Sequence, residues 1–295
     1  MSQPTTVPDT TKPQRSEGLW RKSVKRLFKN PGAVIGLAVI VALVLTAIFA
    51  PVLAPHPPNR QDPLRSLQAP SAEHRLGTDQ FGRDILSRLI YGTRVSLRVG
   101  LVAVGIAALI GMPLGLVAGY YGGWIDMTIS RVIDLMLAFP GILLALVIVS
   151  ILGPSLFNVM VAVGVAASPN YARVVRGSVL AAKENVYVES ARAIGAYVRG
   201  IMMRHILPNI LAPVIVLATL GTAGAILSAA ALSFLGLGAQ PPTAEWGAML
   251  SEGRNYMRLA WWITTFPGIA IMVTVLAVNL LGDGLRDSLD VRLRT

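Results

Sequence analysis

The sequence predicts an all-α integral membrane protein with six transmembrane helices. Of its 295 residues, 54% are hydrophobic and only 14% are charged, whereas a soluble domain carries about 25% charged residues. Six uncharged apolar segments are each close to the ~20 residues that a helix needs to cross a bilayer. A soluble protein can bury one or two such helices, but six favour the membrane. The segments are 33–53, 99–118, 135–152, 154–171, 209–234 and 261–281.

The first segment begins with a helix-start signal and follows a basic cluster. Asn30 is a good N-cap and Pro31 suits the first helical turn, where its missing N–H costs nothing. The segment is longer than the 7–15 apolar residues of a signal peptide. The positive-inside rule keeps its start in the cytoplasm, because a basic cluster that includes Lys22, Lys25, Arg26 and Lys29 precedes it.

Six spans from this start leave both chain ends in the cytoplasm. We expect 55–98 and 235–260 outside, although the seven arginines of 55–98 would not by themselves place it there. The expected organisation is a cytoplasmic tail at 1–30, then the first transmembrane helix with an external segment at 31–98. A transmembrane core follows at 99–284, with a cytoplasmic loop at 173–208, and a cytoplasmic tail closes the chain at 285–295.

The loop at 173–208 contains a polar helix–turn–helix. Tyr187, Ala191 and Ile194 fall on one face of its first helix, and Val198, Ile201, Met202 and His205 fall on one face of its second. Gly195 lies between the two helices, where a turn can use the left-handed conformation. These apolar faces must be covered either by the protein's own helix ends or by a partner protein, and the pattern alone leaves both open.

The segment ESARAIGAYVRGIMMRHILP, 189–208, resembles the EAA loop of ABC-importer permeases. Ser190 replaces the usual middle alanine, and His205 replaces the usual first isoleucine. In that family the loop docks into the ATPase subunit. The resemblance and the helical faces together predict nine ATPase-coupling residues: Tyr187, Glu189, Ser190, Ala191, Gly195, Val198, Met202, Leu207 and Pro208.

Three further segments are similar to the C-type permease of dipeptide, oligopeptide and nickel importers. They are RLGTDQFGRDILSRLIYGTRVSL (75–97), LSFLGLGAQPPTAEWGAML (232–250) and NLLGDGLRDSLD (279–290). The resemblance implies a type I ABC importer permease fold and one half of a pathway for short peptides. It also implies a B-type sister permease, two cytoplasmic ATP-binding subunits, an external substrate-binding protein and a multi-pass location in the bacterial inner membrane. The alternatives are a nickel or other small-solute ABC permease and an ion-coupled secondary transporter.

No catalytic, cofactor or metal site is predicted. The chain has no cysteine, and His56, His74 and His205 are scattered without ligand spacing. The phosphate-binding motif G-x-x-x-x-G-K-[ST] is absent from the sequence, so ATP hydrolysis belongs to a partner. The predicted spans contain no Asp, Glu, Lys or Arg, which disfavours ion coupling. The net charge of +11 on so apolar a chain indicates a membrane surface rather than nucleic acid.

Small residues mark two of the spans. Gly111, Gly115 and Gly119 repeat every four residues, which lets helix backbones approach closely. Their partner is another helix of this chain or of the sister permease. In the fifth span, small residues are interpreted first as packing and then as pathway lining: Gly221, Gly224 and Ser228.

Polar residues outside the spans suggest local structure. Segment 78–84 is a predicted turn that caps a helix over 85–91. Trp246, beside Glu245, is interpreted as an interfacial tryptophan of an external loop. Arg131 and Asp134 are three residues apart and are expected to pair on one helix face.

Overall fold

The computed structural model describes residues 24–289, and within that range every regular element is helical. The predictions made for residues 1–23 and 290–295 of the two tails lie outside the described residues. The helices are α2 (Pro31–Ile48), α3 (Ala50–Leu53), α4 (Ile85–Tyr121), α5 (Gly123–Leu137), α6 (Gly141–Leu152), α7 (Leu156–Lys183), α8 (Val186–Ala193), α9 (Val198–Gly200), α10 (Leu207–Phe234), α11 (Trp246–Gly253) and α12 (Trp262–Leu289). A π-helical stretch, Ile201–Ile206, joins α9 to α10.

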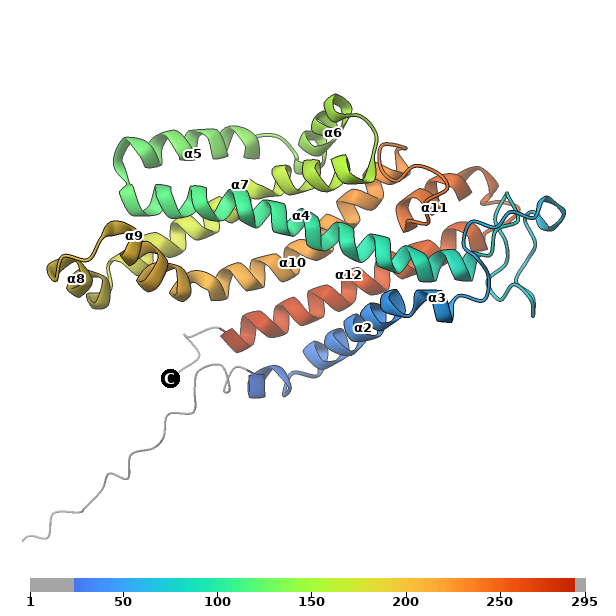
Figure 1. Ribbon diagram of the computed structural model, residues 1–295, viewed down its shortest axis with the longest axis horizontal. Coiled ribbons are helices and arrows are strands. Elements are labelled where there is room, and N and C mark those ends of the chain that lie inside the picture. Colours follow the sequence, from blue (N-terminus) through green and yellow to red (C-terminus); the bar gives the residue numbers. More distant parts are fainter. Residues whose placement is uncertain (1–23, 290–295) are drawn as a thin grey trace, which may run out of the picture.

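The long helices form an elongated bundle with two distinct ends (Figure 1). The connection that contains α8 and α9 lies at one end, where α2 also begins and α12 ends. The segment 54–84 and α11 lie at the opposite end. The described parts next to both chain ends thus lie at the same end of the bundle as the predicted coupling loop.

Four described helical stretches are long and apolar enough to cross a membrane: Pro31–Ile48, Ile85–Tyr121, Val198–Phe234 and Trp262–Leu289. The pair α5–α6 adds a fifth if it counts as one broken span. The predicted segment 154–171 forms the first part of α7, which also carries Asn158, Asn170 and Arg173 and is more polar than the other four. The count of six spans therefore stays a prediction.

The predicted continuous span over 135–152 is wrong. The chain breaks between α5 and α6, and the two helices meet at 90°. Pro140 lacks an N–H group and disfavours helical backbone at Phe139, so α5 ends before it and a new helix begins after it. The segment 119–134, which lies between two of the predicted spans, is helical over most of its length.

The glycine face of α4 packs against α7. A β-carbon at Gly111 would lie 2.5 Å from the backbone oxygen of Ser168, and one at Gly119 would lie 2.8 Å from Val179 Cβ. Among the helices of residues 24–289, these two form the largest contact. The glycine repeat therefore serves packing within this chain, which decides between the two partners that the sequence left open.

Helix α2 is fixed at both of its ends. The Asn30 side chain accepts a hydrogen bond from the Ala33 N–H at 3.3 Å, as predicted for this N-cap. At the other end, the Arg94 guanidinium of α4 donates to Ala47 O at 2.8 Å and Ile48 O at 3.1 Å. A cation here satisfies free carbonyl groups of the helix C-terminus. Helix α4 continues without interruption through residue 98, where the expected external segment meets the transmembrane core.

Candidate functional site

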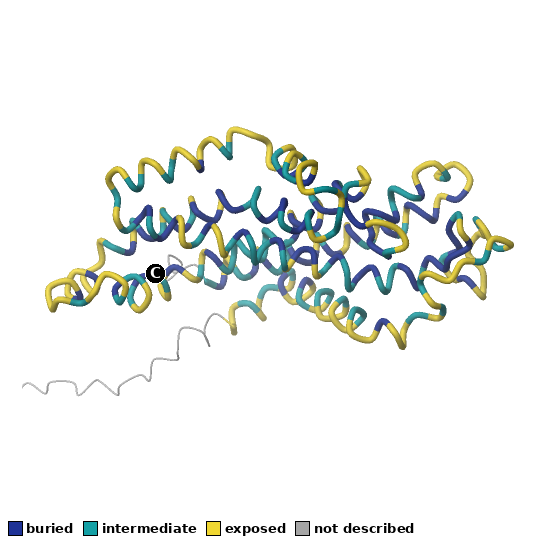
Figure 2. Tube along the Cα trace, turned by 45° about the horizontal axis from the view of Figure 1, so that its top comes forward, coloured by how far each residue is buried: buried dark blue, intermediate teal, exposed yellow. Residues whose placement is uncertain are grey.

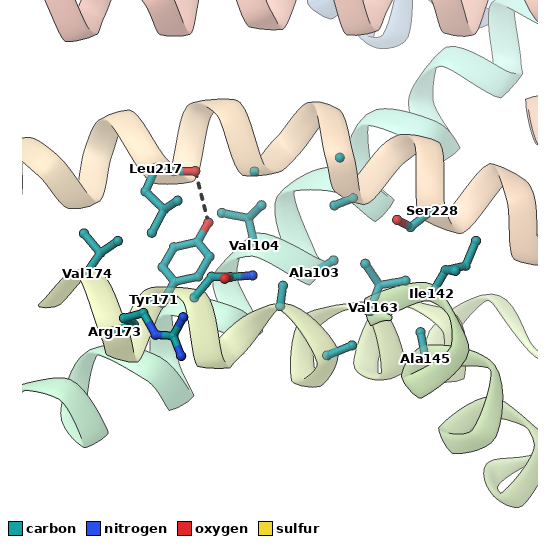
Figure 3. Close-up of a pocket in the computed structure, with 17 residues that line it drawn as sticks. Ala103, Val104, Ile142, Ala145, Val163, Tyr171, Arg173, Val174, Leu217 and Ser228 are labelled. Carbon is teal, nitrogen blue, oxygen red and sulfur yellow. Dashed lines mark hydrogen bonds between the residues drawn. The ribbon is translucent and has the colours of Figure 1, made fainter. Parts of the chain in front are cut away.

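A cavity of about 410 Å³ lies between α4, α6, α7 and α10. Figure 3 shows it bounded by α7 and α10, with Tyr171 near one end and Ser228 near the other. Most of its lining side chains are small or apolar, including Ala103, Val104, Ile142, Ala145, Val163, Gly221, Gly224 and Ser228. The small residues of the fifth predicted span therefore line a cavity, which favours the second interpretation given to them.

Three polar side chains of this cavity come from α7, and Ser228 comes from α10. Asn170, Tyr171 and Arg173 all contribute to its wall. The Tyr171 hydroxyl donates to Leu217 O of α10 at 3.4 Å, a long hydrogen bond that links the two walls. Sequence reasoning did not select these residues. The signal was present, because Asn170 and Tyr171 are polar side chains within or next to an uncharged apolar stretch.

The loop between α7 and α10 contains the predicted left-handed turn at Gly195. This residue has φ +77°. The N–H of Gly195 donates to Arg192 O at 3.0 Å, and the N–H of Ala196 donates to Ala191 O at 3.0 Å. These two bonds form a Schellman motif that ends α8. A β-carbon at Gly195 would meet no other described residue within 4 Å, so the backbone conformation alone demands glycine here.

The loop has one buried face and one exposed face. Val188, Ala191 and Ile201 are buried against Leu116 of α4, Val175 of α7 and neighbouring core residues. The prediction that Ala191 shares a face with Tyr187 and Ile194 is wrong, because Ala191 is buried while Tyr187 and Ile194 are exposed. The protein's own helix ends thus cover one face, and Figure 2 shows that much of this end of the bundle remains exposed.

The exposed face carries large apolar side chains. The exposed fraction is 84% for Ile194 and 88% for Tyr197, and Val186 and Val198 are also exposed. Of the remaining predicted coupling residues, Glu189, Ser190 and Pro208 are exposed, while Met202 and Leu207 are partly buried. Arg192, three residues after Glu189, lies over the ring of Tyr120 at 5.5 Å. A surface of this kind on a monomer typically marks an interaction site.

The second loop helix continues directly into α10. The Leu207 N–H donates to Met202 O, five residues back, which is the π-helical pattern. Pro208 falls in the first turn of α10 and so opens the next span, within one helical stretch over Val198–Phe234. The loop is therefore joined rigidly to a helix that lines the cavity.

Two ion pairs hold α5 against α7. The Arg176 guanidinium donates to both carboxylate oxygens of Asp126, with N–O distances of 2.5 and 2.6 Å. Arg173 binds Asp134 at 2.8 Å, with both side chains more than half exposed. The expected pairing of Arg131 with Asp134 is wrong, because α7 supplies the partner. Since α7 also lines the cavity and leads into the loop, it connects all three features.

The opposite end of the bundle holds a buried ionic network. Arg83 binds Asp79 at 2.6 Å and also binds Glu252. Arg88 lies 3.3 Å from Glu252 and 3.7 Å from Asp79. Both arginine side chains are only 1% exposed. The network joins the segment before α4 to the segment after α10, so two stretches that are far apart in sequence form one structure.

Trp246 lies inside this structure and is not an interfacial residue. Only 1% of it is exposed, and its indole N–H donates to Leu89 O at 3.2 Å. Neighbouring Glu245 is also buried and accepts bonds from the N–H groups of Gly247 and Ala248 at 3.0 and 2.8 Å. Burial raises the pKa of the Glu245 carboxyl group, while these two bonds oppose the increase.

The expected turn before α4 is confirmed, and it contains a cluster that sequence reasoning missed. Asp84 caps α4 by accepting from the Ser87 N–H at 2.8 Å. The same carboxylate lies beside His74 and His56, and one donor atom from each of the three lies within 4.8 Å of the others. His56 and His74 are therefore not scattered, whereas His205 lies apart from them. Their spacing of 18 residues gives no periodic signal, because a folded loop brings them together.

Two family comparisons cover most of the chain. Residues 111–295 match the family described as binding-protein-dependent transport system inner membrane component. Residues 18–70 match the family described as the N-terminal TM domain of oligopeptide transport permease C. The second match contains α2 and the start of the external segment.

Curated relatives match over nearly their full length. The chain is 52% identical to the dipeptide transport system permease protein of Alkalihalophilus pseudofirmus, over 94% of this chain and 91% of the relative. It is 47% identical to the glutathione transport system permease protein of Pectobacterium atrosepticum, over 94% and 92%. Among solved structures, an inward-facing MetNI methionine ABC transporter matches with a TM-score of 0.56 and 21% identity, covering 68% of this chain and 96% of that one. That likeness concerns the fold.

Proposed function

The chain belongs to the family of binding-protein-dependent transport system inner membrane components, and from this premise we propose that it is the peptide-importing permease of an ATP-driven transporter. It would form one half of the pathway for short peptides. Relatives named for dipeptide and glutathione transport support this substrate class. A sister permease of the B type would supply the other half.

The observation that carries the proposal is the continuity between the exposed loop and the cavity. Helix α7 leads into the loop and α10 leads out of it, and both helices line the cavity. A force on the exposed apolar face of the loop would therefore move two cavity walls together. Two cytoplasmic ATP-binding subunits would supply this force when they close on ATP.

The proposed coupling residues divide between two roles. Tyr187, Glu189, Ser190 and Val198 are exposed and would contact the ATPase. Ala191, Met202 and Leu207 pack on the ends of the chain's own helices. They would transmit the movement. Gly195 and Pro208 would set the geometry of the turn and of the entry into α10.

We place six membrane crossings in α2, α4, the broken pair α5–α6, α7, α10 and α12. The cytoplasm would then receive 1–30, 173–208 and 285–295, and an external binding protein would meet 55–98 and 235–260. The location of the first and last described residues at the loop end of the bundle supports this arrangement (Figure 1). The division into a segment 31–98 and a core 99–284 follows the same proposal.

Reconstitution tests the energy source and the substrate together. The chain is inserted into liposomes with its sister permease and ATPases, and labelled dipeptide, tripeptide, glutathione and Ni²⁺ are supplied with the binding protein. We expect uptake of peptide that depends on internal ATP. Uptake of Ni²⁺ alone would replace the peptide assignment. Accumulation by this chain alone, driven by an ion gradient without nucleotide, would refute the ATP-driven mechanism.

Topology is tested separately on the intact cell. The chain has no cysteine, so each introduced cysteine reports one position without background from this chain. Cysteines at Ser190 and at Ser66 should be labelled from the inside and from the outside, respectively. External labelling at position 190 would overturn the proposed orientation.

A further inference from the structure

We propose that His56, His74 and Asp84 form a binding site for a divalent transition-metal cation of the Zn²⁺ type. The site lies at the end of the bundle opposite α8, where the segment 54–84 folds over the start of α4 (Figure 1). It goes beyond the transport function and involves neither the cavity nor the loop. The inference depends on geometry and on donor chemistry.

The three side chains present a compact donor set. Asp84 Oδ1 lies 2.9 Å from His74 Nδ1 and 3.8 Å from His56 Nδ1. The ring centroids of the two histidines are 4.8 Å apart. Zn²⁺ binds His nitrogen and Asp oxygen at about 2.0–2.2 Å, which keeps the ligand atoms of a tetrahedral site about 3.3 Å apart. The two observed distances lie on either side of this value.

Two ring nitrogens of the cluster have no partner in the described residues. These are His56 Nδ1 and His74 Nε2, and both atoms are buried. His74 itself is only 6% exposed. A buried polar atom without a hydrogen bond is costly, so it usually indicates a water, an ion or another group at that position. A cation bound by His56 Nδ1, His74 Nδ1 and Asp84 Oδ1 would use the free capacity of His56 Nδ1, whereas His74 Nε2 lies outside this donor set.

Neighbouring hydrogen bonds orient the donors. Ser87 donates from its N–H and its hydroxyl to Asp84 Oδ2, at 2.8 and 2.7 Å, which leaves Oδ1 directed at the histidines. The Ser87 hydroxyl oxygen also accepts from the backbone N–H of His56 at 3.0 Å. The backbone N–H of His74 donates to the Ser71 hydroxyl oxygen at 3.1 Å. Hydrogen bonds to a ligating carboxylate, like those from Ser87 to Asp84, are typical of metal sites, and the two backbone bonds fix where the chain carries the histidines.

A small polar cavity of about 150 Å³ adjoins the cluster and has room for a water as a fourth ligand. Its wall also contains Arg60, Asp62, Arg65 and Glu73. Arg65 binds Glu73 and lies 3.3 Å from Asp62, and these two acids together balance the charges of Arg60 and Arg65. Asp84 is left to offset the charge of the cation.

Closing the site requires a small movement of one side chain. His74 and Asp84 are held by the packing around them, whereas the side chain of His56 is 28% exposed. A small rotation of the His56 side chain would shorten the 3.8 Å between His56 Nδ1 and Asp84 Oδ1 toward the ~3.3 Å of a tetrahedral Zn²⁺ site. His56 is therefore the ligand whose removal disturbs the fold least.

The test measures Zn²⁺ binding to the full chain, purified through a tag without histidine and stripped with a chelator. Zn²⁺ is titrated in competition with a chromophoric chelator, and Co²⁺ is used to record the visible absorption bands of a protein-bound ion. We expect one Zn²⁺ per chain. His56→Ala should weaken binding at least 10-fold and remove the Co²⁺ bands, because it removes a ligand. Asp84→Asn should weaken binding in the same direction.

The third histidine provides the matched control. His205 lies in the loop before α10, at the other end of the bundle, so His205→Ala should bind Zn²⁺ as the unchanged chain does. Equal affinity of the unchanged chain and His56→Ala would assign the ion to other surface groups and overturn the proposal. Absence of Zn²⁺ binding by the unchanged chain would overturn it as well.

Discussion

Replacing Gly195 by valine should uncouple the transporter without removing it from the membrane. Gly195 has φ +77°, in the left-handed region, and a β-carbon there would meet no other described residue within 4 Å. The cost is therefore backbone strain alone. For an L-residue this strain is about 1–2 kcal/mol, which changes the population of the native turn by a factor of roughly 5–30. For a β-branched side chain such as valine, the strain energy lies at the upper end of this range.

The strain acts where the exposed face of the loop is set. Ile194 and Tyr197 lie on either side of Gly195 and are the most exposed large apolar side chains of the loop. When the Schellman motif is lost, these side chains no longer hold one relative position. We expect weaker association with the ATPase and a loss of ATP-driven uptake, while Val188 and Ala191 keep α8 on the helix ends.

Two other glycines make the assay decisive. Gly153 has φ +89° with equally open space, but it lies in the turn between α6 and α7. Gly153 has ψ 159°, in a region that essentially only glycine adopts, so Gly153→Val introduces strain at least as large away from the loop. Gly200 lies in the loop in right-handed helical conformation, so Gly200→Ala introduces no strain. Abundance in the membrane, ATPase co-purification and uptake are measured for all three. Normal uptake by Gly195→Val with its ATPase bound, or equal loss by Gly153→Val, would refute the reasoning.

Three further changes test other parts of the structure. Gly111→Val should reduce the thermal stability of the purified chain by an amount equivalent to about 1–3 kcal/mol of overpacking, whereas Gly105→Val on the same helix meets no described residue within 4 Å and should have a small effect. Asp126→Ala removes a bidentate ion pair and should lower the free energy of unfolding by roughly 1–2 kcal/mol. Asp134→Ala, whose partner is exposed, should lower it by only about 0–1 kcal/mol. Equal losses of stability in the two variants would contradict this order. Burial raises the pKa of the Glu245 carboxyl group in the native state, so its protonated form stabilises that state below the ordinary carboxyl pKa of about 4.3. This stabilisation is lost as the pH rises through the raised pKa of the native state. The melting temperature of Glu245→Gln should therefore vary less between pH 4 and 8, and identical pH profiles would exclude the effect.

Much of the architecture follows from local sequence. The apolar stretches predict helices because a bilayer offers no water to the backbone N–H and C=O groups. A helix satisfies these groups by hydrogen bonds within the segment. Asn30 and Pro31 mark a helix start through their own side-chain chemistry, and the structure confirms it. Gly195 indicates a left-handed turn through its own backbone, because glycine adopts positive φ without steric cost, and the structure has φ +77° there. The resemblance of the loop and of three longer segments then indicated the family.

The pairing of these helices and side chains was decided by the tertiary structure. The glycine face of α4 indicates a close neighbour, but only the fold identifies α7 as that neighbour. Asp134 has a basic residue three positions away and nevertheless binds Arg173, because α5 lies against α7. The sequence predicts an interfacial position for Trp246. The side chain is buried instead, because the segment after α10 folds onto α4.

The three-residue cluster at the start of α4 shows the same limit most clearly. His74 and Asp84 are ten residues apart, and His56 lies 18 residues before His74, with no helical or strand period to link them. A turn rich in hydrogen bonds brings them together, and its path depends on contacts with distant residues, such as the bond from the Trp262 indole N–H to Thr78 O at 3.2 Å. The sequence by itself determined that most of the apolar segments are helical, because helix formation depends on neighbouring residues. Contacts between distant segments depend on the whole fold, so only the tertiary structure decided which side chains meet.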